Sequence, residues 1–164
     1  MKIIAIDPGY ERVGIAILEK SHVATAMRDR EVLLFSECFI TSTKEKHEDR
    51  LRLIGEEIEK IIKKYEPEAM GIETLFFKTN AKTAMKVSEA RGVIMYEAAK
   101  NGLKVMEFTP LQIKVAVTGY GKSDKEQVTE MVKRLIKITK PIKHDDEYDA
   151  IACGLTYFAC YKNR

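Results

Sequence analysis

The sequence predicts a single α/β domain, residues 1–164, built on a mixed five-stranded β-sheet flanked by helices. Short apolar runs typical of buried strands come first, and helical repeats of apolar residues then alternate with further strand patterns. The link between the first two strands is too short for a crossover, so we expect them to pair antiparallel. The later strands are joined by helices, so we expect them to run parallel.

Three strand patterns fall within the first forty residues. Residues 2–6 are rich in isoleucine, lead to Asp7 and are closed by Pro8-Gly9, which is typical of a buried strand followed by a turn. Residues 12–18 form a second strand pattern, and residues 32–40 form a third. Residues 20–30 fit no pattern that predicts an element.

The middle of the chain predicts two helices around a fourth strand. Ser42 and Glu45 have the spacing of a capping box, and apolar residues then recur at helical spacing up to Tyr65. Residues 69–72 form a short apolar strand that ends at Glu73. A second helix is expected over residues 80–100, because Asn101-Gly102 supplies a stop signal.

The last third predicts a fifth strand and three helices. Residues 103–108 form the strand, and Thr109-Pro110 with Gln112 supplies a cap and an initial proline for a short helix. Ser123 with Glu126 predicts the start of the next helix. Its apolar face consists of Val128, Met131, Val132, Leu135 and Ile136. The final helix is expected from about residue 145 to about residue 161.

The charge distribution is uneven although the formal net charge is only +3. Residues 78–143 contain 14 Lys or Arg and 6 Asp or Glu, and the remainder contains 14 basic and 19 acidic residues. Such a segment can form a basic face for a polyanion, although solvated lysines on helices explain the same bias. The net charge alone therefore does not predict a nucleic-acid-binding protein.

Cysteine usage and hydropathy predict a cytoplasmic protein. Cys38, Cys153 and Cys160 match neither a zinc site nor a redox pair, so free thiols in a reducing compartment are expected. The chain has no basic-then-apolar leader and no apolar run long enough to span a membrane.

Two predicted strands end in a carboxylate. Asp7 follows the first strand and Glu73 follows the fourth. If these strands are parallel neighbours, both acids lie at the carboxyl edge of the sheet, where open α/β sheets bind ligands. Close carboxylates repel each other, so such a pair either shifts a pKa or binds a cation. Each acid taken alone is better explained as a turn or helix cap.

Asp146 and Asp149 lie on one face at the start of the last helix. The helix dipole alone explains acids in a first turn, but Asp149 precedes a strongly apolar stretch and is expected to be half-buried with a partner. Four carboxylates suit Mg²⁺ or Mn²⁺ better than zinc. Two such ions about 4 Å apart would support phosphodiester hydrolysis.

The sequence resembles the RuvC family of Holliday junction resolvases, which are homodimeric nucleases with a ribonuclease H-like fold. The matching stretches are IDPGYERVGIAIL from residue 6, IETLFFKTNAKTAMKVSEARG from residue 72, FTPLQIKVAVTGYGKSDKEQV from residue 108 and DEYDAIACGL from residue 146. They span nearly the whole chain in the family's order.

The resemblance implies a metal-dependent endodeoxyribonuclease that binds a four-way DNA junction as a dimer. It implies paired symmetric nicks that leave 5′-phosphate and 3′-hydroxyl ends, and two Mg²⁺ ions, for which Mn²⁺ can substitute. The family's catalytic and metal-binding acids fall on Asp7, Glu73, Asp146 and Asp149. The third ligand stays open among His144, Asp145 and Asp146. The branch-migration proteins RuvA and RuvB are candidate partners.

Candidate DNA-binding residues follow from the same resemblance. Phe76 matches an aromatic position that stacks on junction bases, and the adjacent Phe77 is a second candidate, although either ring could instead pack in the core. Lys114 and Lys125 match basic positions near the site, and Lys125 also lies in the first turn of a capped helix. Lys78 and Lys122 are further candidates from their position alone.

Small residues in the 80–100 helix match the family's two-fold contact, although core packing explains them equally well. Two other functions also stay open. A non-catalytic junction-binding protein would keep the fold without turnover. A sugar kinase or ATPase-like relative would share the glycine after the first strand acid, but the chain has no second nucleotide-binding glycine motif.

Overall fold

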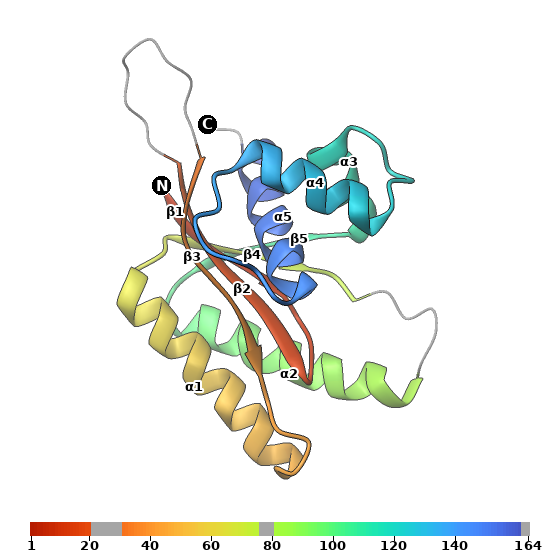
Figure 1. The fold of residues 1–164 in the computed structure, drawn as a ribbon. Helices are drawn as coiled ribbons and strands as arrows, with labels where there is room; N and C mark the ends of the chain where they lie inside the picture. The colour runs from red at the N-terminus through yellow and green to blue at the C-terminus, as the bar shows by residue number, and fades with distance from the viewer. Residues whose placement is uncertain (21–30, 76–80, 162–164) are drawn as a thin grey trace.

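The computed structural model describes residues 1–20, 31–75 and 81–161, and these form a five-stranded sheet covered by helices (Figure 1). The strand order is β3-β2-β1-β4-β5. The predicted α/β class and mixed sheet are confirmed. The strands are β1 (Lys2–Asp7), β2 (Arg12–Lys20), β3 (Glu31–Ile40), β4 (Ala69–Glu73) and β5 (Lys104–Phe108). The helices are α1 (His47–Tyr65), α2 (Ala81–Lys100), α3 (Pro110–Thr118), α4 (Lys125–Leu135) and α5 (Asp145–Cys160).

The strand directions agree with the sequence prediction. β1 and β2 form an antiparallel hairpin, and β3 extends it antiparallel to β2. β4 pairs parallel to β1, and β5 pairs parallel to β4. The carboxyl ends of β1, β4 and β5 therefore meet at one edge of the sheet. No helix among the described residues is long and apolar enough to cross a membrane.

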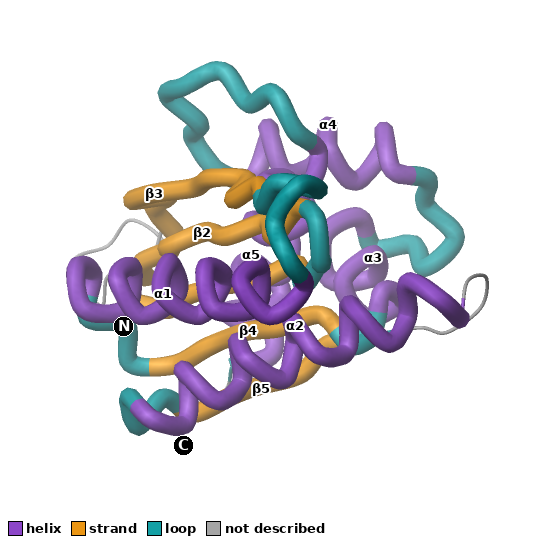
Figure 2. The backbone as a smooth tube through the Cα atoms, turned by 90° about the horizontal axis from the view of Figure 1, so that it is seen from below, coloured by secondary structure: helices purple, strands orange, loops and turns teal. Residues whose placement is uncertain are grey.

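Two apolar cores lie on opposite faces of the sheet, because alternate side chains of each strand point to opposite faces. Ile4 and Ile6 of β1 pack with Ile54 and Ile58 of α1. Ile3 and Ala5 of β1 pack in the other core, which includes α5. Figure 2 shows α1 and α2 in front of the sheet, and Figure 1 shows α3, α4 and α5 on its other face.

The apolar helix α5 lies directly on β1 and β2. Gly154 permits this contact, because a Cβ atom there would lie 2.4 Å from Leu18 Cδ1 and 3.2 Å from Ala5 Cβ. Ala150, Ile151 and Ala152 of the same helix are fully buried. Close packing of the small residues fixes the height of α5 above the sheet.

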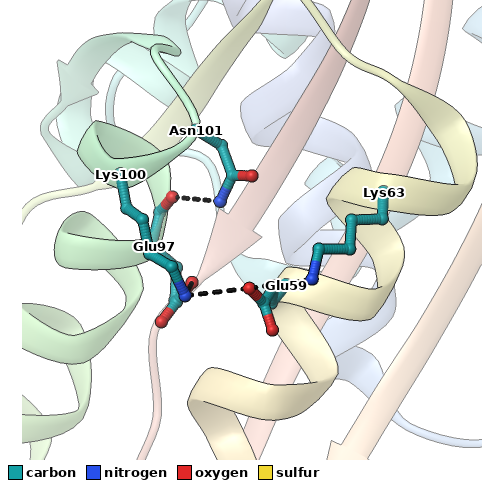
Figure 3. A network of polar contacts seen from close by, with 5 residues as sticks. All are labelled: Glu59, Lys63, Glu97, Lys100 and Asn101. Carbon is teal, nitrogen blue, oxygen red and sulfur yellow. Dashed lines mark hydrogen bonds and ion pairs between the residues drawn. The ribbon is translucent and has the colours of Figure 1, made fainter.

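Charged residues connect α1 and α2 (Figure 3). Lys100 Nζ lies 2.8 Å from Glu59 Oε1 on α1 and 3.2 Å from Glu97 Oε2 on its own helix. Lys63 Nζ also lies 3.0 Å from Glu59 Oε1. Lys63 and Lys100 are exposed, so their pairs with Glu59 contribute little to stability, whereas the Glu97 carboxylate is buried.

The predicted capping box of Ser42 and Glu45 is wrong. Helix α1 begins at His47, and its N-cap Lys46 makes no side-chain cap bond. The Ser42 hydroxyl instead accepts a hydrogen bond from Lys44 N at 3.2 Å. Residues 42–46 form a turn after β3, and serine stabilises such turns by the same local bonding that it uses in caps.

The predicted cap of α4 by Ser123 is also wrong, by one residue. Asp124 is the N-cap, and it forms a reciprocal capping box with Gln127. The Ser123 hydroxyl is buried and bonds Tyr120 O at 2.8 Å, so it closes the preceding loop. The box of Thr109 with Gln112 at the start of α3 is confirmed.

The α4 cap gives a test of this assignment. We expect Asp124→Ala to lower the free energy of unfolding by about 1 kcal/mol, because the Gln127 N–H loses its partner. Ser42→Ala is the control and should change it by less than about 0.5 kcal/mol. Urea denaturation measures both, and equal effects of the two substitutions would contradict the assignment.

Candidate active site

Asp7 and Glu73 lie side by side at the carboxyl edge of the sheet. β1 and β4 pair parallel with Ile6 opposite Ile72, so the next residue of each strand is an acid. Asp7 follows Ile3 and Ala5 in the two-residue alternation, which places its side chain on the face covered by α5. The predicted convergence of these two acids is confirmed.

The first turn of α5 lies directly above Asp7. Gly14 of β2 is paired with Asp7, and a Cβ atom on Gly14 would lie 2.0 Å from the Asp146 carbonyl oxygen. The same atom would lie 3.2 Å from Asp7 Cβ. The glycine therefore lets the backbone of α5 approach the strand hairpin at the point where the acids are.

Side chains from five elements line an open pocket of about 280 Å³ at this position. Acids enter it from β1, β4 and α5, and lysines enter it from α3 and α4. The lining residues are Asp7, Glu73, Pro110, Ile113, Lys114, Lys125, Val128 and Asp149.

Burial and mutual repulsion raise the pKa values of the acids in this pocket. Burial raises the pKa of Asp7 well above its usual value, and the charges of Glu73, Asp149 and Asp146 add to the effect. Burial and the charge of Asp149 raise the pKa of Glu73 to about 7. Burial likewise raises the pKa of Asp149. Such a cluster of carboxylates favours binding of a cation.

Lys125 supplies positive charge at the centre of this cluster. Its Nζ lies 2.6 Å from Asp145 Oδ2 and 2.9 Å from Asp149 Oδ2. Partial burial opposes its charge, but its hydrogen bonds to these two carboxylates raise the pKa of Lys125. The expected half-burial of Asp149 and its need for a partner are both confirmed, since its side chain is 25% exposed.

Asp146 and Asp145 face different partners. Asp146 Oδ2 lies 3.4 Å from Arg12 Nε, and Cys38 Sγ lies 3.8 Å from the same oxygen. Asp146 raises the pKa of Asp7, whereas the exposed Asp145 bonds Lys125, which lowers the pKa of Asp145. Of the two acids considered for the third ligand, Asp146 is the one whose charge acts on Asp7, although its carboxylate contacts Arg12 and Cys38 and is not among the pocket's lining residues.

Sequence reasoning missed the residues that hold the start of α5. Ser36 Oγ of β3 donates to Glu147 Oε2 at 2.9 Å. Lys140 Nζ donates to the same carboxylate at 2.7 Å and to Ser36 O at 2.6 Å. Arg12 was missed as well. The alternation of side chains along β2 could have indicated Arg12, because it places Arg12 on the same face as Gly14 and Ala16, which α5 covers.

The four candidate acids have the donor chemistry of a divalent metal site. Asp7, Glu73, Asp146 and Asp149 offer only carboxylate oxygens, which are ligands that Mg²⁺ and Mn²⁺ prefer, and the raised pKa values of Asp7, Glu73 and Asp149 show a deficit of positive charge. Within the described part of the chain, however, no three His, Cys, Asp or Glu side chains stand close enough together to hold an ion. The chemistry therefore fits a divalent ion, although Asp146 contacts Arg12 and Asp149 contacts Lys125 in this structure.

The candidate DNA-binding residues fall into three groups. Lys114 and Lys125 line the pocket, and Lys114 lowers the pKa of Glu73. Lys122 is exposed in the loop between α3 and α4 and is not among the lining residues. Phe76, Phe77 and Lys78 lie outside the described residues, so their roles stay predictions.

Comparison with known families identifies this arrangement. Residues 3–157 match the family described as crossover junction endodeoxyribonuclease RuvC. The chain belongs to the RuvC family. The RuvC of Thermosipho melanesiensis is 45% identical over 153 residues, which cover 93% of each chain. The RuvC of Fusobacterium nucleatum is 40% identical over 157 residues, covering 96% of this chain and 80% of the relative.

Solved RuvC structures have the same fold. The Thermus thermophilus RuvC structure matches with a TM-score of 0.85 and 28% identity, covering 97% of this chain and 94% of that chain. A second structure shows T. thermophilus RuvC in complex with Holliday junction substrate, and it also matches with a TM-score of 0.85. It covers 96% of this chain and 93% of that chain, at 28% identity.

The raised pKa of Glu73 predicts a pH-dependent stability when divalent ions are removed. The pKa of about 7 exceeds the ordinary value of 4.5, so the folded state loses stability as the pH rises through this interval. The difference corresponds to roughly 3 kcal/mol. Glu73→Gln removes the ionisation, so the variant should exceed the wild-type protein in stability by up to this amount near pH 8.

Urea denaturation in EDTA measures this effect at both ends of the interval. The variant and the wild-type protein should differ little near pH 4.5, because Glu73 is then protonated in the folded state. A gap between the two proteins that stays constant from pH 4.5 to pH 8 would contradict the raised pKa.

Proposed function

We propose that the protein is a metal-dependent endodeoxyribonuclease that resolves Holliday junctions, acting through one nuclease domain over residues 1–164. One observation carries the proposal most directly. Acids from β1, β4 and α5 share a pocket with two lysines, in a chain that belongs to the RuvC family. A pocket with both carboxylates and ammonium groups suits a metal-assisted reaction of a phosphodiester. A Holliday junction bound to T. thermophilus RuvC supports the choice of substrate.

Asp7, Glu73, Asp146 and Asp149 are the residues that would hold the metal ions. We propose two Mg²⁺ ions, for which Mn²⁺ can substitute. Bound there, the ions would activate a water molecule and stabilise the leaving oxygen of the cleaved phosphodiester. Asp7 and Glu73 each end a strand that is paired on both sides, so the backbone of the sheet fixes both positions.

The lysines of the pocket would bind the DNA backbone. Lys114 and Lys125 enter the pocket from α3 and α4, so a phosphate between them would lie beside Glu73 and Asp149. Lys122 is exposed near them and would contact the same strand. Phe76, Phe77 and Lys78 follow β4 in sequence, and we propose that Phe76 stacks on unpaired junction bases.

A two-fold dimer would place two such pockets symmetrically on a four-way junction. Helix α2 supports this arrangement, because Met85 and Tyr96 are 70% and 64% exposed on it. Large exposed apolar side chains are common where proteins associate. We further propose cytoplasmic action beside RuvA and RuvB, and paired nicks that leave 5′-phosphate and 3′-hydroxyl ends.

Cleavage of a synthetic four-way junction tests the proposal. We expect the purified protein with Mg²⁺ or Mn²⁺ to nick two strands of like polarity in the junction, and to leave a linear duplex of the same sequence intact. EDTA should abolish the nicks. Equal cleavage of both substrates would indicate a nuclease without junction selectivity, and absence of nicks despite tight junction binding would favour the non-catalytic alternative.

Asp7→Asn tests the role of the acid at the end of β1. We expect cleavage to fall to background because a charged ligand is lost, while junction affinity in EDTA changes by less than about threefold. The protein should stay folded, since the substitution also removes repulsion from Glu73 and Asp149. Gel-shift and cleavage assays on one preparation measure both properties. A variant that binds no junction and has no cooperative unfolding transition would make Asp7 a structural residue instead.

A further inference from the structure

We propose that Lys125 is a built-in counter-ion of the acidic pocket and competes with divalent metal ions for Asp149. The inference deepens the proposed function, because it rests on Asp149 as a metal ligand. It concerns metal affinity in the absence of DNA, which can be measured without any cleavage.

The position of the Lys125 ammonium carries the argument. Nζ donates to Asp149 Oδ2 at 2.9 Å, and Asp149 is one of the three acids lining the pocket. An ion bound to this oxygen would take the place of the ammonium. A divalent ion and an ammonium group at the same carboxylate also repel each other, so the two cations compete for it.

The charge of Lys125 also acts on acids that its side chain does not contact. Its charge lowers the pKa of Asp7, Glu73 and Asp149, and so opposes the burial and repulsion that raise those values. Lys114 acts in the same direction on Glu73, and Arg12 contacts Asp146 from the rim. Lys125 is therefore the cation that acts on three of the four candidate ligands together.

Asp145 provides a place for Lys125 when a metal ion binds. Its Oδ2 lies 2.6 Å from Nζ, and its side chain is 51% exposed at the pocket's edge. Lys125 can break its contact with Asp149 and keep the one with Asp145. The ammonium then stays beside the pocket, free of Asp149 and available to a DNA phosphate.

This exchange makes metal binding and phosphate binding favour each other. A phosphate near α4 would draw the ammonium away from Asp149 and so remove the competitor of the metal ion. By linkage, a metal ion at Asp149 would release the ammonium for the phosphate. The pocket would thus bind divalent ions weakly until DNA is present.

Titration with Mn²⁺ in the absence of DNA tests the proposal. We expect Lys125→Met to bind Mn²⁺ roughly tenfold more tightly than the wild-type protein. Even at the dielectric constant of water, the repulsion between a unit charge and a divalent ion about 5 Å apart is large enough for such a change in affinity. Lys125→Arg keeps the charge and should stay within about threefold of the wild-type affinity. Isothermal calorimetry on protein freed of metal by EDTA and dialysis measures all three.

Lys133→Met is the matched control. Lys133 lies on the same helix, is exposed and pairs with Glu130 at 2.7 Å, so its loss removes the same charge without touching the pocket. Its Mn²⁺ affinity should equal that of the wild-type protein. An equal gain in Lys125→Met and Lys133→Met would overturn the proposal, because net charge would then explain the effect.

Equal or weaker Mn²⁺ binding by folded Lys125→Met would also overturn it. If that variant does not fold, the wild-type protein provides the test. The side-chain ammonium signal of Lys125 in proton–nitrogen NMR should shift on addition of Mg²⁺, and an unchanged signal at saturating Mg²⁺ would overturn the competition.

Failure of the proposed function would look different. If Lys125→Met binds Mn²⁺ more tightly but the wild-type protein nicks no junction, the competition is supported and the proposed nuclease function is overturned. If neither the wild-type protein nor Lys125→Met binds Mn²⁺, both the competition and the metal-binding role of the acids are overturned.

Discussion

Repulsion among buried carboxylates is the constraint on which this structure depends. Asp7 and Glu73 are held side by side by the pairing of β1 with β4, and α5 brings Asp146 and Asp149 over them. Burial removes the water that would otherwise screen their charges. The lysines of α3 and α4 and Arg12 of β2 offset this cost in part. A stable fold thus maintains a local excess of negative charge, as sites prepared for a cation commonly do.

Burying these acids destabilises the folded state, and the apolar packing of the rest of the domain offsets that cost. Two apolar cores sandwich the sheet, and the small residues of α5 let it lie close to β1 and β2. Gly14 lets the first turn of α5 approach β2 beside the acids, and Gly154 lets the body of α5 pack on β1 and β2 in the core. In both places a side chain would prevent the contact between helix and strand. The acids are therefore positioned by backbone contacts between regular elements. Sites built in this way are held more precisely than sites on loops.

Much of this arrangement could be predicted from the sequence, because strand ends and helical repeats leave clear patterns. Asp7 and Glu73 each follow an apolar strand pattern, and their convergence could be predicted on the condition that the two strands are parallel neighbours. The half-burial of Asp149 could be predicted from its apolar neighbours. The caps of α1 and α4 could not be assigned in this way, since Ser42 and Ser123 bond locally in turns with the same pattern that caps use. The contact of Lys125 with Asp145 and Asp149 joins residues twenty or more positions apart, and only the packing of α4 beside α5 determines it.

Helix α5 is held by different contacts at its two ends. Its later turns are buried among apolar side chains, whereas its first turn depends on Ser36, Lys140 and Glu147 and on ion pairs at the surface. Charged contacts near solvent weaken as salt is added, and apolar packing does not. The surface ion pairs of Arg12 and Lys125 with this turn can accordingly weaken while the buried Ser36–Glu147 contact and the body of the domain stay intact. In concentrated salt, activity would then be lost before the protein unfolds. Circular dichroism would still show native secondary structure in the inactive protein.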